Sequence, residues 1–445
     1  MNRLPIPKNI SSNPLRLLAQ LALLFIIAVL PAAAGRAEIS SRQVDDTYTK
    51  LEQFAAVLSL LQDYYVDEID TARIIDGAID GLLFSLDPHS AYLTQERYRD
   101  LREETSGMII GIGVEVTMEE GRIMVISPIA GTPAAAAGIK ARDVILAIDG
   151  QPVEEVPPFE AIKRLRGQEG SQVSISVYRE GEENLLEFTL TREPISIDSV
   201  IFTELGGNIW WVRIAAFQQD TAAELARHLA EAEKSEEIRG LILDLRNNPG
   251  GLLNQAVQVV NFFIEDAPIV STRGRDPRQN SIYQASATAP YGHVPMVVLI
   301  NEGSASGAEI VAGALQDHRR ALVVGTVSFG KGSVQTVIPM ANGTALRVTT
   351  ARYYTPNGRS IQETGISPDL PIGPGTSVSE DGHGTERVRE MDLAHHLANP
   401  DRPAEPTTVL AEDAARLLAG DSQLQAAYTV ITSIAWYAAA AESKK

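Results

Sequence analysis

The sequence predicts an α/β core that carries an inserted β-rich module, with a helical region before the module and a helical tail after the core. Between residues 193 and 372, apolar strands alternate with helical segments, which is typical of a sheet with crossover helices packed on it. Between residues 107 and 192, β-branched strands are separated by glycines at short intervals. Residues 38–106 instead repeat apolar side chains at three- and four-residue steps, which indicates helices.

These patterns predict the following elements. Helices are expected at 51–65, 75–82 and 98–104, and the turn Asp87-Pro88-His89-Ser90 ends the second because proline cannot continue a helix. The module is expected to have one helix at 158–166 and strands at 114–116, 122–127, 143–148, 172–178 and 186–190. The core is expected to have helices at 221–234, 252–264 and 306–316, and strands at 209–214, 240–245, 296–300, 321–324, 334–339 and 344–350. Residues 373–390 read as a linker, and the tail is expected to end in a helix capped by Asp421, with an apolar face formed by Leu424, Ala427, Ile431 and Ile434.

The first 37 residues have the pattern of an export signal. Arg3, Lys8 and Arg16 precede an apolar run at 17–30, and small residues then offer cleavage sites. Because this segment carries four basic residues and no acid, its removal changes the net charge from −19 to −23. Such an acidic chain disfavours nucleic acid and anionic membranes as partners. An uncleaved signal that anchors the chain is the alternative, because the apolar run is long enough to span a bilayer.

A serine on a turn of small residues is the first candidate for catalysis. The segment 301–307, with sequence NEGSASG, lies between an expected strand and an expected helix. A helix N-terminus presents unpaired N–H groups and a positive dipole end, which stabilise an oxyanion. Ser306 is therefore the candidate nucleophile, and Ser304 is the next choice. A serine that merely caps the helix is the alternative.

A serine nucleophile needs a base, and no histidine lies within ten residues of Ser306. Lys331 lies between two glycines 25 residues further on, and a lysine acts as a base only when burial lowers its pKa. Gln335 is placed to orient its amine by a hydrogen bond. Residues 325–331 also fit most of a phosphate-binding P-loop. Gly332 stands where that pattern needs Ser or Thr, and a strand follows where a helix should, so nucleotide binding is not expected.

A third segment, residues 244–251 with sequence DLRNNPGG, lies at the end of a strand and before a helix. Its Pro-Gly-Gly makes a tight turn that can aim backbone N–H groups at a site. An ordinary turn between a strand and a helix is the alternative.

Together these segments resemble the carboxyl-terminal processing, or tail-specific, protease family over about residues 50–372. The family's markers occur in order, as LDPHSAYL at 86–93, GIG at 111–113, DLRNNPGG at 244–251, SAS at 304–306, FGKG at 329–332 and YYTPNGRSI at 353–361. By this resemblance Ser306 is the nucleophile, Lys331 is the general base, and Gln335 orients the lysine. The resemblance also gives Asp317 a structural role.

The resemblance further implies an oxyanion hole made by the amide of Gly307 with Gly250 or Gly251. The family commonly has Ala or Ser where Gly307 stands, and a backbone amide tolerates that difference. The core is expected to have layered ββα elements like those of crotonase and ClpP.

The module is similar to a PDZ domain, which binds an extended C-terminus by strand addition. Its carboxylate-binding loop would be formed by Ile110, Gly111, Ile112 and Gly113, and the helix at 158–166 would be the other wall of the groove.

The sequence thus predicts an exported serine endopeptidase, located in a bacterial periplasm, that recognises protein C-termini and uses no metal or cofactor. Its expected partners are proteins or peptides with free C-termini, and a homo-oligomer and a regulatory or adaptor protein are further candidates. The predicted domains are the signal (1–37), the helical region (38–106), the PDZ-like module (107–192), the protease core (193–372) and the linker with the tail (373–445). Two rivals stay open: a catalytically silent scaffold that binds tails, and an acyl-transfer enzyme, which would not need the module.

Overall fold

The computed structural model describes residues 41–119, 122–375 and 412–442. The chain divides into two units, Met1–Ile79 and Asp80–Lys445, which are considered separately. The predicted export signal and residues 376–390 of the predicted linker lie outside the described residues. Within the described ranges, no helix combines the length and the apolar character that a membrane span requires.

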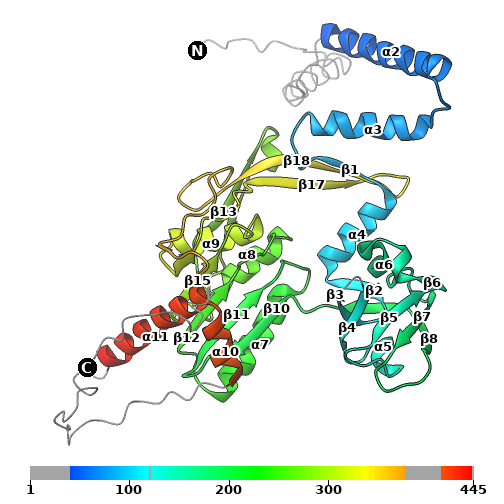
Figure 1. Ribbon diagram of the computed structural model, residues 1–445. Coiled ribbons are helices and arrows are strands. Elements are labelled where there is room, and N and C mark those ends of the chain that lie inside the picture. The colour runs from blue at the N-terminus through cyan, green and yellow to red at the C-terminus, as the bar shows by residue number, and fades with distance from the viewer. Residues whose placement is uncertain (1–40, 120–121, 376–411, 443–445) are drawn as a thin grey trace, which may run out of the picture. The chain divides into compact units, whose positions relative to one another are not determined.

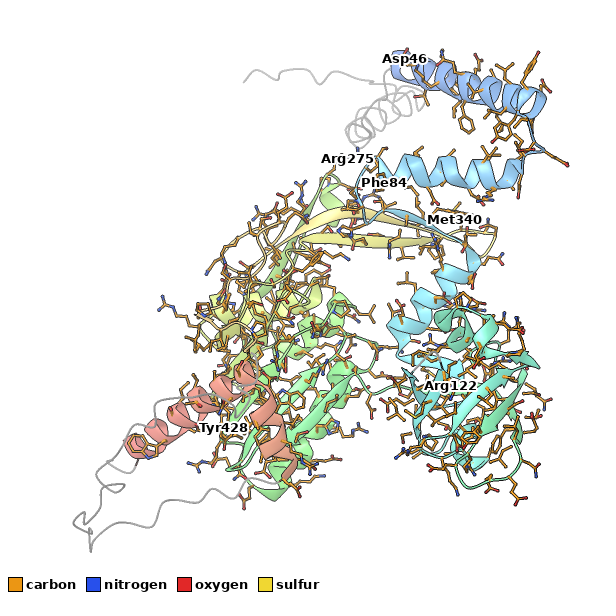
Figure 2. All side chains as sticks on the ribbon, viewed as in Figure 1. Asp46, Phe84, Arg122, Arg275, Met340 and Tyr428 are labelled. Atoms are coloured by element: carbon orange, nitrogen blue, oxygen red, sulfur yellow. The ribbon has the colours of Figure 1, made fainter. Side chains whose placement is uncertain are left out.

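The first unit contains the two helices that the apolar repeats predicted. They are α2 (Ser41–Tyr64) and α3 (Thr71–Phe84), the second of which continues into the next unit. Their apolar side chains stay largely exposed: the exposed fraction is 57% for Leu51 and 77% for Phe84. Figure 2 labels Phe84. The repeat therefore marks a helix here without marking a core.

The second unit contains a six-stranded sheet (Figure 1). Its order is β10-β11-β12-β15-β16-β19, with β10 antiparallel to β11 and every other pair parallel. The strands are β10 (Val200–Glu204), β11 (Ile209–Ile214), β12 (Gly240–Asp244), β15 (Met296–Ile300), β16 (Leu322–Gly325) and β19 (Leu370–Pro371). The four inner strands were predicted, and the two edge strands were not.

Helices cover both faces of this sheet. Side chains alternate between the faces along each strand, so each face has apolar side chains that the helices bury. Val298 and Ile300 of β15 pack in one core with the three predicted helices, α7 (Thr221–Ser235), α8 (Leu253–Asn261) and α9 (Gly307–Asp317). Val297 and Leu299 pack in a second core with the tail helices α10 (Glu412–Gly420) and α11 (Ser422–Glu442). Burial on both faces explains why the inner strands read as continuous apolar runs.

The tail is part of the folded unit. Asp421 caps α11 as predicted, because its Oδ1 accepts the Leu424 N–H at 3.0 Å. Leu424, Ala427 and Ile431 of the predicted apolar face are buried, while Ile434 is 41% exposed. Helix α10 was not predicted.

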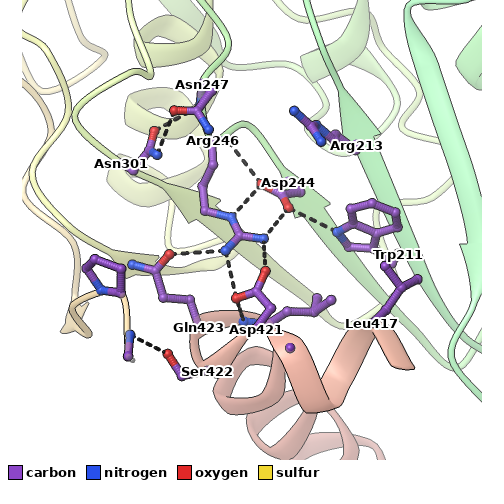
Figure 3. A pocket seen from close by; sticks show the side chains of 14 residues that line it. Trp211, Arg213, Asp244, Arg246, Asn247, Asn301, Leu417, Asp421, Ser422 and Gln423 are labelled. Atoms are coloured by element: carbon purple, nitrogen blue, oxygen red, sulfur yellow. Dashed lines mark hydrogen bonds and ion pairs between the residues drawn. The ribbon is translucent and has the colours of Figure 1, made fainter. Parts of the chain in front are cut away.

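A half-buried arginine joins this tail to the segment 244–251 (Figure 3). The Arg246 guanidinium lies between the carboxylates of Asp244 and Asp421, with Nη2 at 2.6 Å from an oxygen of each, and Nη1 donates to Gln423 Oε1 at 3.1 Å. Burial alone would raise the pKa of Asp421, but the hydrogen bonds from Arg246 hold it below its ordinary value. This contribution to stability is present at neutral pH and is lost as the pH falls through the lowered pKa.

The β-rich module has strand order β3-β4-β5-β7-β8, with β6 paired to β5. Its strands are β3 (Val114–Glu119), β4 (Arg122–Pro128), β5 (Val144–Ile148), β6 (Gln151–Pro152), β7 (Gln172–Tyr178) and β8 (Leu186–Thr191). A separate pair joins β2 (Met108–Gly111) to β9 (Glu193–Ser196), and a 3-10 turn, η1, covers Val153–Glu155. The prediction of one helix was wrong: α5 (Pro133–Ala136) accompanies α6 (Pro158–Arg164), because proline at the first position starts a short helix after Thr132.

A second sheet follows directly on the lysine segment, residues 328–331. Its central strand is β18 (Ala345–Tyr354), which pairs with β17 (Ser333–Pro339) along one edge. Along its other edge β18 pairs first with β1 (Ala91–Leu93) and then with β13 (Pro268–Gly274), which in turn pairs with β14 (Ser281–Gln284). Met340 lies at the turn between β17 and β18 (Figure 2). The predicted charged helix is α4 (Gln95–Ser106), which follows β1, and a 3-10 turn, η2, covers Pro277–Gln279.

Candidate active site

Ser306 lies at the N-cap of α9 with an unusual backbone. Its φ is 53° and its ψ is −109°, in the positive-φ region that residues with a side chain rarely adopt. A conformation of this kind costs about 1–3 kcal/mol and persists only where surrounding contacts impose it. Ser306 is half-buried. The strain marks this position as one that the fold holds in a specific geometry.

The contact that imposes this geometry is the carboxylate of Glu309, which has no exposed surface. Its Oε2 accepts the backbone N–H of Ser306 at 2.8 Å and that of Lys331 at 2.9 Å. Its Oε1 accepts the N–H of Gly330 and the hydroxyl of Ser328, both at 2.6 Å. One oxygen atom therefore binds the backbone of the predicted nucleophile and the backbone of the predicted base. The two segments that the sequence separates by 25 residues meet at this carboxylate.

The amine of Lys331 is in an environment that favours its neutral form. Burial lowers the pKa of Lys331 first, and the positive charge of Arg347 lowers it further, while Glu309 opposes both. Across the described ranges, the Nζ atom has no hydrogen-bond or ion-pair partner. A half-buried lysine with a lowered pKa can accept a proton, which an exposed lysine at neutral pH cannot do.

The glycine turn, residues 247–251, lies directly against Ser306. A Cβ atom on Gly250 would stand 2.7 Å from Ser306 Cβ and 2.9 Å from the amide nitrogen of Gly307, so only glycine fits there. The Gly250 N–H already donates to Asn248 Oδ1 at 2.8 Å. Within the described part of the chain, the N–H groups of Gly251 and Gly307 donate to no protein acceptor. Of the two glycines that the resemblance left open, Gly251 is therefore the better placed as an oxyanion donor.

Ser304, the second choice for nucleophile, and His318, the histidine nearest to Ser306 in the sequence, have structural partners. Ser304 is fully buried, and its hydroxyl donates to the Leu245 carbonyl oxygen at 2.7 Å and accepts the Asn301 N–H at 3.0 Å. His318 ends α9 at the opposite end from Ser306, and its Nε2 lies 2.7 Å from the Pro268 carbonyl oxygen.

Hydrogen bonds between asparagines join the glycine turn to the serine turn, residues 301–306. Asn301 Oδ1 accepts the N–H of Asn247 at 2.8 Å, and Asn301 Nδ2 donates to Asn247 Oδ1 at 2.9 Å. The carbonyl oxygen of Asn248 accepts the Ala305 N–H at 2.9 Å, and its Nδ2 donates to the Ile214 carbonyl oxygen at 2.8 Å. These bonds hold the two turns at a fixed separation.

Gln335 lies on β17 and is bonded away from its expected partner. Its Nε2 donates to Ser333 Oγ at 2.7 Å and to Thr349 Oγ1 at 3.4 Å. No hydrogen bond joins it to Lys331 in the part of the chain that the structure describes. Its Oε1 atom stays free to accept one.

Asp317 has the structural role that the resemblance implied. Its carboxylate pairs with the Arg359 guanidinium and accepts the Asn357 N–H at 2.9 Å. These contacts hold the segment 353–361 against the end of α9.

The predicted peptide-binding loop lies at the end of a groove in the module. The N–H groups of Ile112 and Gly113 have no acceptor among the described residues. Gly113 has a φ of 82°, and a Cβ there would stand 2.3 Å from Thr132, so no other residue fits. A cavity beside these amides lies between β3 and α6 and is lined mainly by apolar side chains, including Val114, Val116, Ile129, Ile162 and Leu165.

The residue that sequence reasoning missed is Glu309. Its signal was present, since Ser306-Gly-Ala-Glu309 fits the capping-box pattern in which a glutamate binds the N-cap N–H. What the pattern does not show is the three further contacts of this carboxylate, to Ser328, Gly330 and Lys331. A search for metal sites finds no group of three or more His, Cys, Asp or Glu side chains within the described ranges.

Comparison with known proteins identifies the families of the core, the module and the N-terminal region. Residues 208–372 match Peptidase family S41, and residues 111–190 match the PDZ domain family. Residues 30–97 match the family described as activating protease CtpB N-terminal domain. The protein is therefore a serine-type peptidase with a PDZ domain.

The relatives narrow this class. A carboxy-terminal-processing protease of Bartonella bacilliformis is 42% identical over 337 residues, which cover 75% of this chain and 77% of that protein. Carboxy-terminal processing protease CtpB of Bacillus subtilis is 34% identical over 350 residues, or 78% of this chain and 71% of that protein. Among solved structures, a photosystem II D1 C-terminal processing protease is 30% identical, covers 73% of this chain and 93% of its own, and has a TM-score of 0.43. The chain belongs to the carboxy-terminal-processing protease family.

Glu309→Gln should lower both stability and peptidase activity. The substitution keeps the shape of the side chain but replaces one acceptor oxygen with an NH2 group, which would face N–H or O–H donors in a site closed to water. We expect a loss of about 2–4 kcal/mol in the free energy of unfolding, measured by urea denaturation.

The matched control is Glu302→Gln, seven residues earlier. Glu302 is exposed and accepts one hydrogen bond, from Thr326 Oγ1 at 2.9 Å. We expect a change within about 0.5 kcal/mol for this variant. Equal stability of the two variants would contradict the role given to Glu309.

Proposed function

We propose that the protein is an exported endopeptidase in which Ser306 is the nucleophile and neutral Lys331 is the general base. The observation that carries this proposal is the Glu309 carboxylate, which binds the backbones of both residues. The second requirement is an unprotonated amine, since only that form can take the proton of a serine hydroxyl, and the lowered pKa of Lys331 favours this form.

In the first half of the reaction, Ser306 Oγ attacks the scissile carbonyl carbon and its proton passes to Lys331 Nζ. The carbonyl oxygen becomes an oxyanion, which the N–H groups of Gly251 and Gly307 are placed to bind. The intermediate then collapses, the C–N bond breaks, and Lys331 gives its proton to the leaving amine. An acyl-enzyme on Ser306 and a free amine result.

In the second half, water attacks the acyl carbon and transfers a proton to Lys331. The C–O bond to Ser306 breaks, and the proton returns to Ser306 Oγ. Each half-reaction begins and ends with the same protonation state of Lys331, so a single lysine suffices as base and acid. Gln335 would keep the amine directed at Ser306 through its free Oε1 atom.

Recognition of substrate tails is proposed for the PDZ domain. The unpartnered amides of Ile112 and Gly113 suit a terminal carboxylate, and the apolar groove between β3 and α6 suits an extended peptide added as a strand. We place the protein in a bacterial periplasm on the basis of the basic and apolar pattern of residues 1–37. Retention through an uncleaved signal is the alternative. The exposed apolar side chains of α2 would serve contact with a second copy or a regulatory protein.

A catalytically silent scaffold is the rival function. The strained backbone of Ser306 weighs against it, because a protein that only binds tails has no use for a conformation that costs stability. The same holds for the buried charge of Glu309.

Ser306→Ala should abolish peptidase activity and leave the fold intact, because the nucleophile is lost while the Glu309 half of the capping box, made to the backbone of residue 306, remains. Cleavage of a fluorogenic peptide and the thermal unfolding midpoint measure the two effects. Ser304→Ala is the comparison: it should lower stability through the bond to Leu245 yet retain catalysis. Full activity of the Ser306 variant would remove Ser306 as nucleophile.

Amidation of a substrate's C-terminus should weaken its binding at least tenfold, since a neutral amide forms weaker hydrogen bonds with the Ile112 and Gly113 amides than a carboxylate does. Calorimetric titration of the Ser306→Ala variant with paired peptides gives the two dissociation constants. Equal constants would assign the PDZ domain to another task than reading the terminal carboxylate.

A further inference from the structure

The turn Asp87-Pro88-His89-Ser90 has no part in the proposed chemistry, yet it is bonded to the sheet that follows the lysine segment. Arg347 Nε on β18 donates to the His89 carbonyl oxygen at 3.0 Å. The Thr349 N–H donates to Ser90 Oγ at 3.2 Å, and Thr349 Oγ1 donates to Asp87 Oδ1 at 3.1 Å. The turn is thus fixed to β18 opposite the place where β17 carries Gln335.

Asp87 is an ionised carboxylate in this turn. Burial alone would raise its pKa, but hydrogen bonds from the Ser90 hydroxyl, the His89 and Ser90 N–H groups and Thr349 together hold the pKa below its ordinary value. Its Oδ1 accepts both N–H groups at 2.8 Å, and its Oδ2 accepts the Ser90 hydroxyl at 2.8 Å. An ionised carboxylate has no proton to donate, so it acts only as an acceptor.

This fixes the direction of the next hydrogen bond. A threonine hydroxyl has a single hydrogen, and Thr349 gives it to Asp87. Toward Gln335, Thr349 Oγ1 can then only accept, so the amide must present its NH2 group to Thr349. The Oε1 atom of Gln335 is consequently directed to the other side of the amide.

An irregularity in the pairing of β17 with β18 places Gln335 opposite Thr349. The pairing of β17 with β18 shifts between Val334 and Gln335, so that Val334 pairs with Ala351 while Gln335 pairs with Thr349. An extra residue of this kind is a β-bulge, which re-aims side chains and often lies beside active sites. The turn also lies within electrostatic reach of the base: when Lys331 is protonated, its charge is, after burial, the next cause that lowers the pKa of His89.

We propose that Asp87 and Thr349 are positioning residues for catalysis: they fix the amide of Gln335 so that its Oε1 atom faces Lys331. This inference rests on the proposed function, since it needs Lys331 as base and Gln335 as its orienting group. It assigns a role to the turn Asp87-Pro88-His89-Ser90, which lies in the chain between α3 and β1.

The test is a double-mutant cycle on Thr349 and Gln335. Thr349→Val removes the hydroxyl and keeps the side-chain shape. The amide then keeps only its bond to Ser333 Oγ, and because a hydroxyl can accept or donate, that bond permits either orientation of the amide. We therefore expect kcat to fall about tenfold while KM changes less than about twofold. Thr349→Ser keeps the hydroxyl and should restore most of the rate. In a Gln335→Leu background, Thr349→Val should cause no further loss, because the two residues act in series. Asp87→Asn should fall to the level of Thr349→Val.

Thr336→Val is the matched control. Its hydroxyl pairs with that of Thr350 at 2.8 Å on the same two strands and contacts neither Asp87 nor Gln335 among the bonds of the described residues. It should retain wild-type kcat, and thermal unfolding should show that all variants are folded. Wild-type kcat in folded Thr349→Val, or additive losses in the double variant, would overturn the inference. An inactive wild-type protein, or an active Ser306→Ala variant, would instead overturn the proposed function and this inference with it.

Discussion

The carboxylate of Glu309 holds the two halves of the site together. A buried charge is costly unless every lone pair finds a donor, and here four donors at 2.6–2.9 Å meet that need. Two of them are the backbone amides of the predicted nucleophile and base. The bonds are made by backbone atoms, so they hold the chain and leave the Ser306 and Lys331 side chains available for chemistry. The positive φ of Ser306 is the local cost of this arrangement.

The rest of the fold supports this contact from several sides. Strands β12 and β15 of the six-stranded sheet end at the glycine turn and the serine turn, which asparagine bonds hold together. The tail helices cover the outer face of the sheet and reach the glycine turn through Asp421 and Arg246. The turn Asp87-Pro88-His89-Ser90 is bonded to Thr349 of β18, which pairs with Gln335 on β17. Residues outside the S41 match thus help to define the site.

The inner strands and the longer core helices could be predicted from the sequence. A strand buried on both faces is a continuous apolar run, and a helix buried on one face repeats its apolar residues at helical spacing. Sequence reasoning missed β13 and β14, whose residues mix polar and apolar types and whose strands exist through pairing with β18. The candidate residues Ser306, Lys331 and Gly307 were placed on the right local structures by motif and spacing. The choice of Gly251 over Gly250 depends on Asn248, and the link through Glu309 depends on a contact between segments that no local pattern records. The apolar repeat of α2 indicated a helix but not a buried one.

The central claim is that neutral Lys331 activates Ser306, and the pH dependence of covalent labelling tests it most directly. A fluorophosphonate probe reacts with the activated serine, and mass spectrometry locates the adduct. The account predicts an adduct on Ser306 whose rate of formation rises with pH to a plateau, with a midpoint below the ordinary lysine pKa of about 10.4, and no labelling of Lys331→Arg, since a guanidinium keeps its proton. An adduct on another residue, a rate independent of pH, or normal labelling of the arginine variant would contradict it.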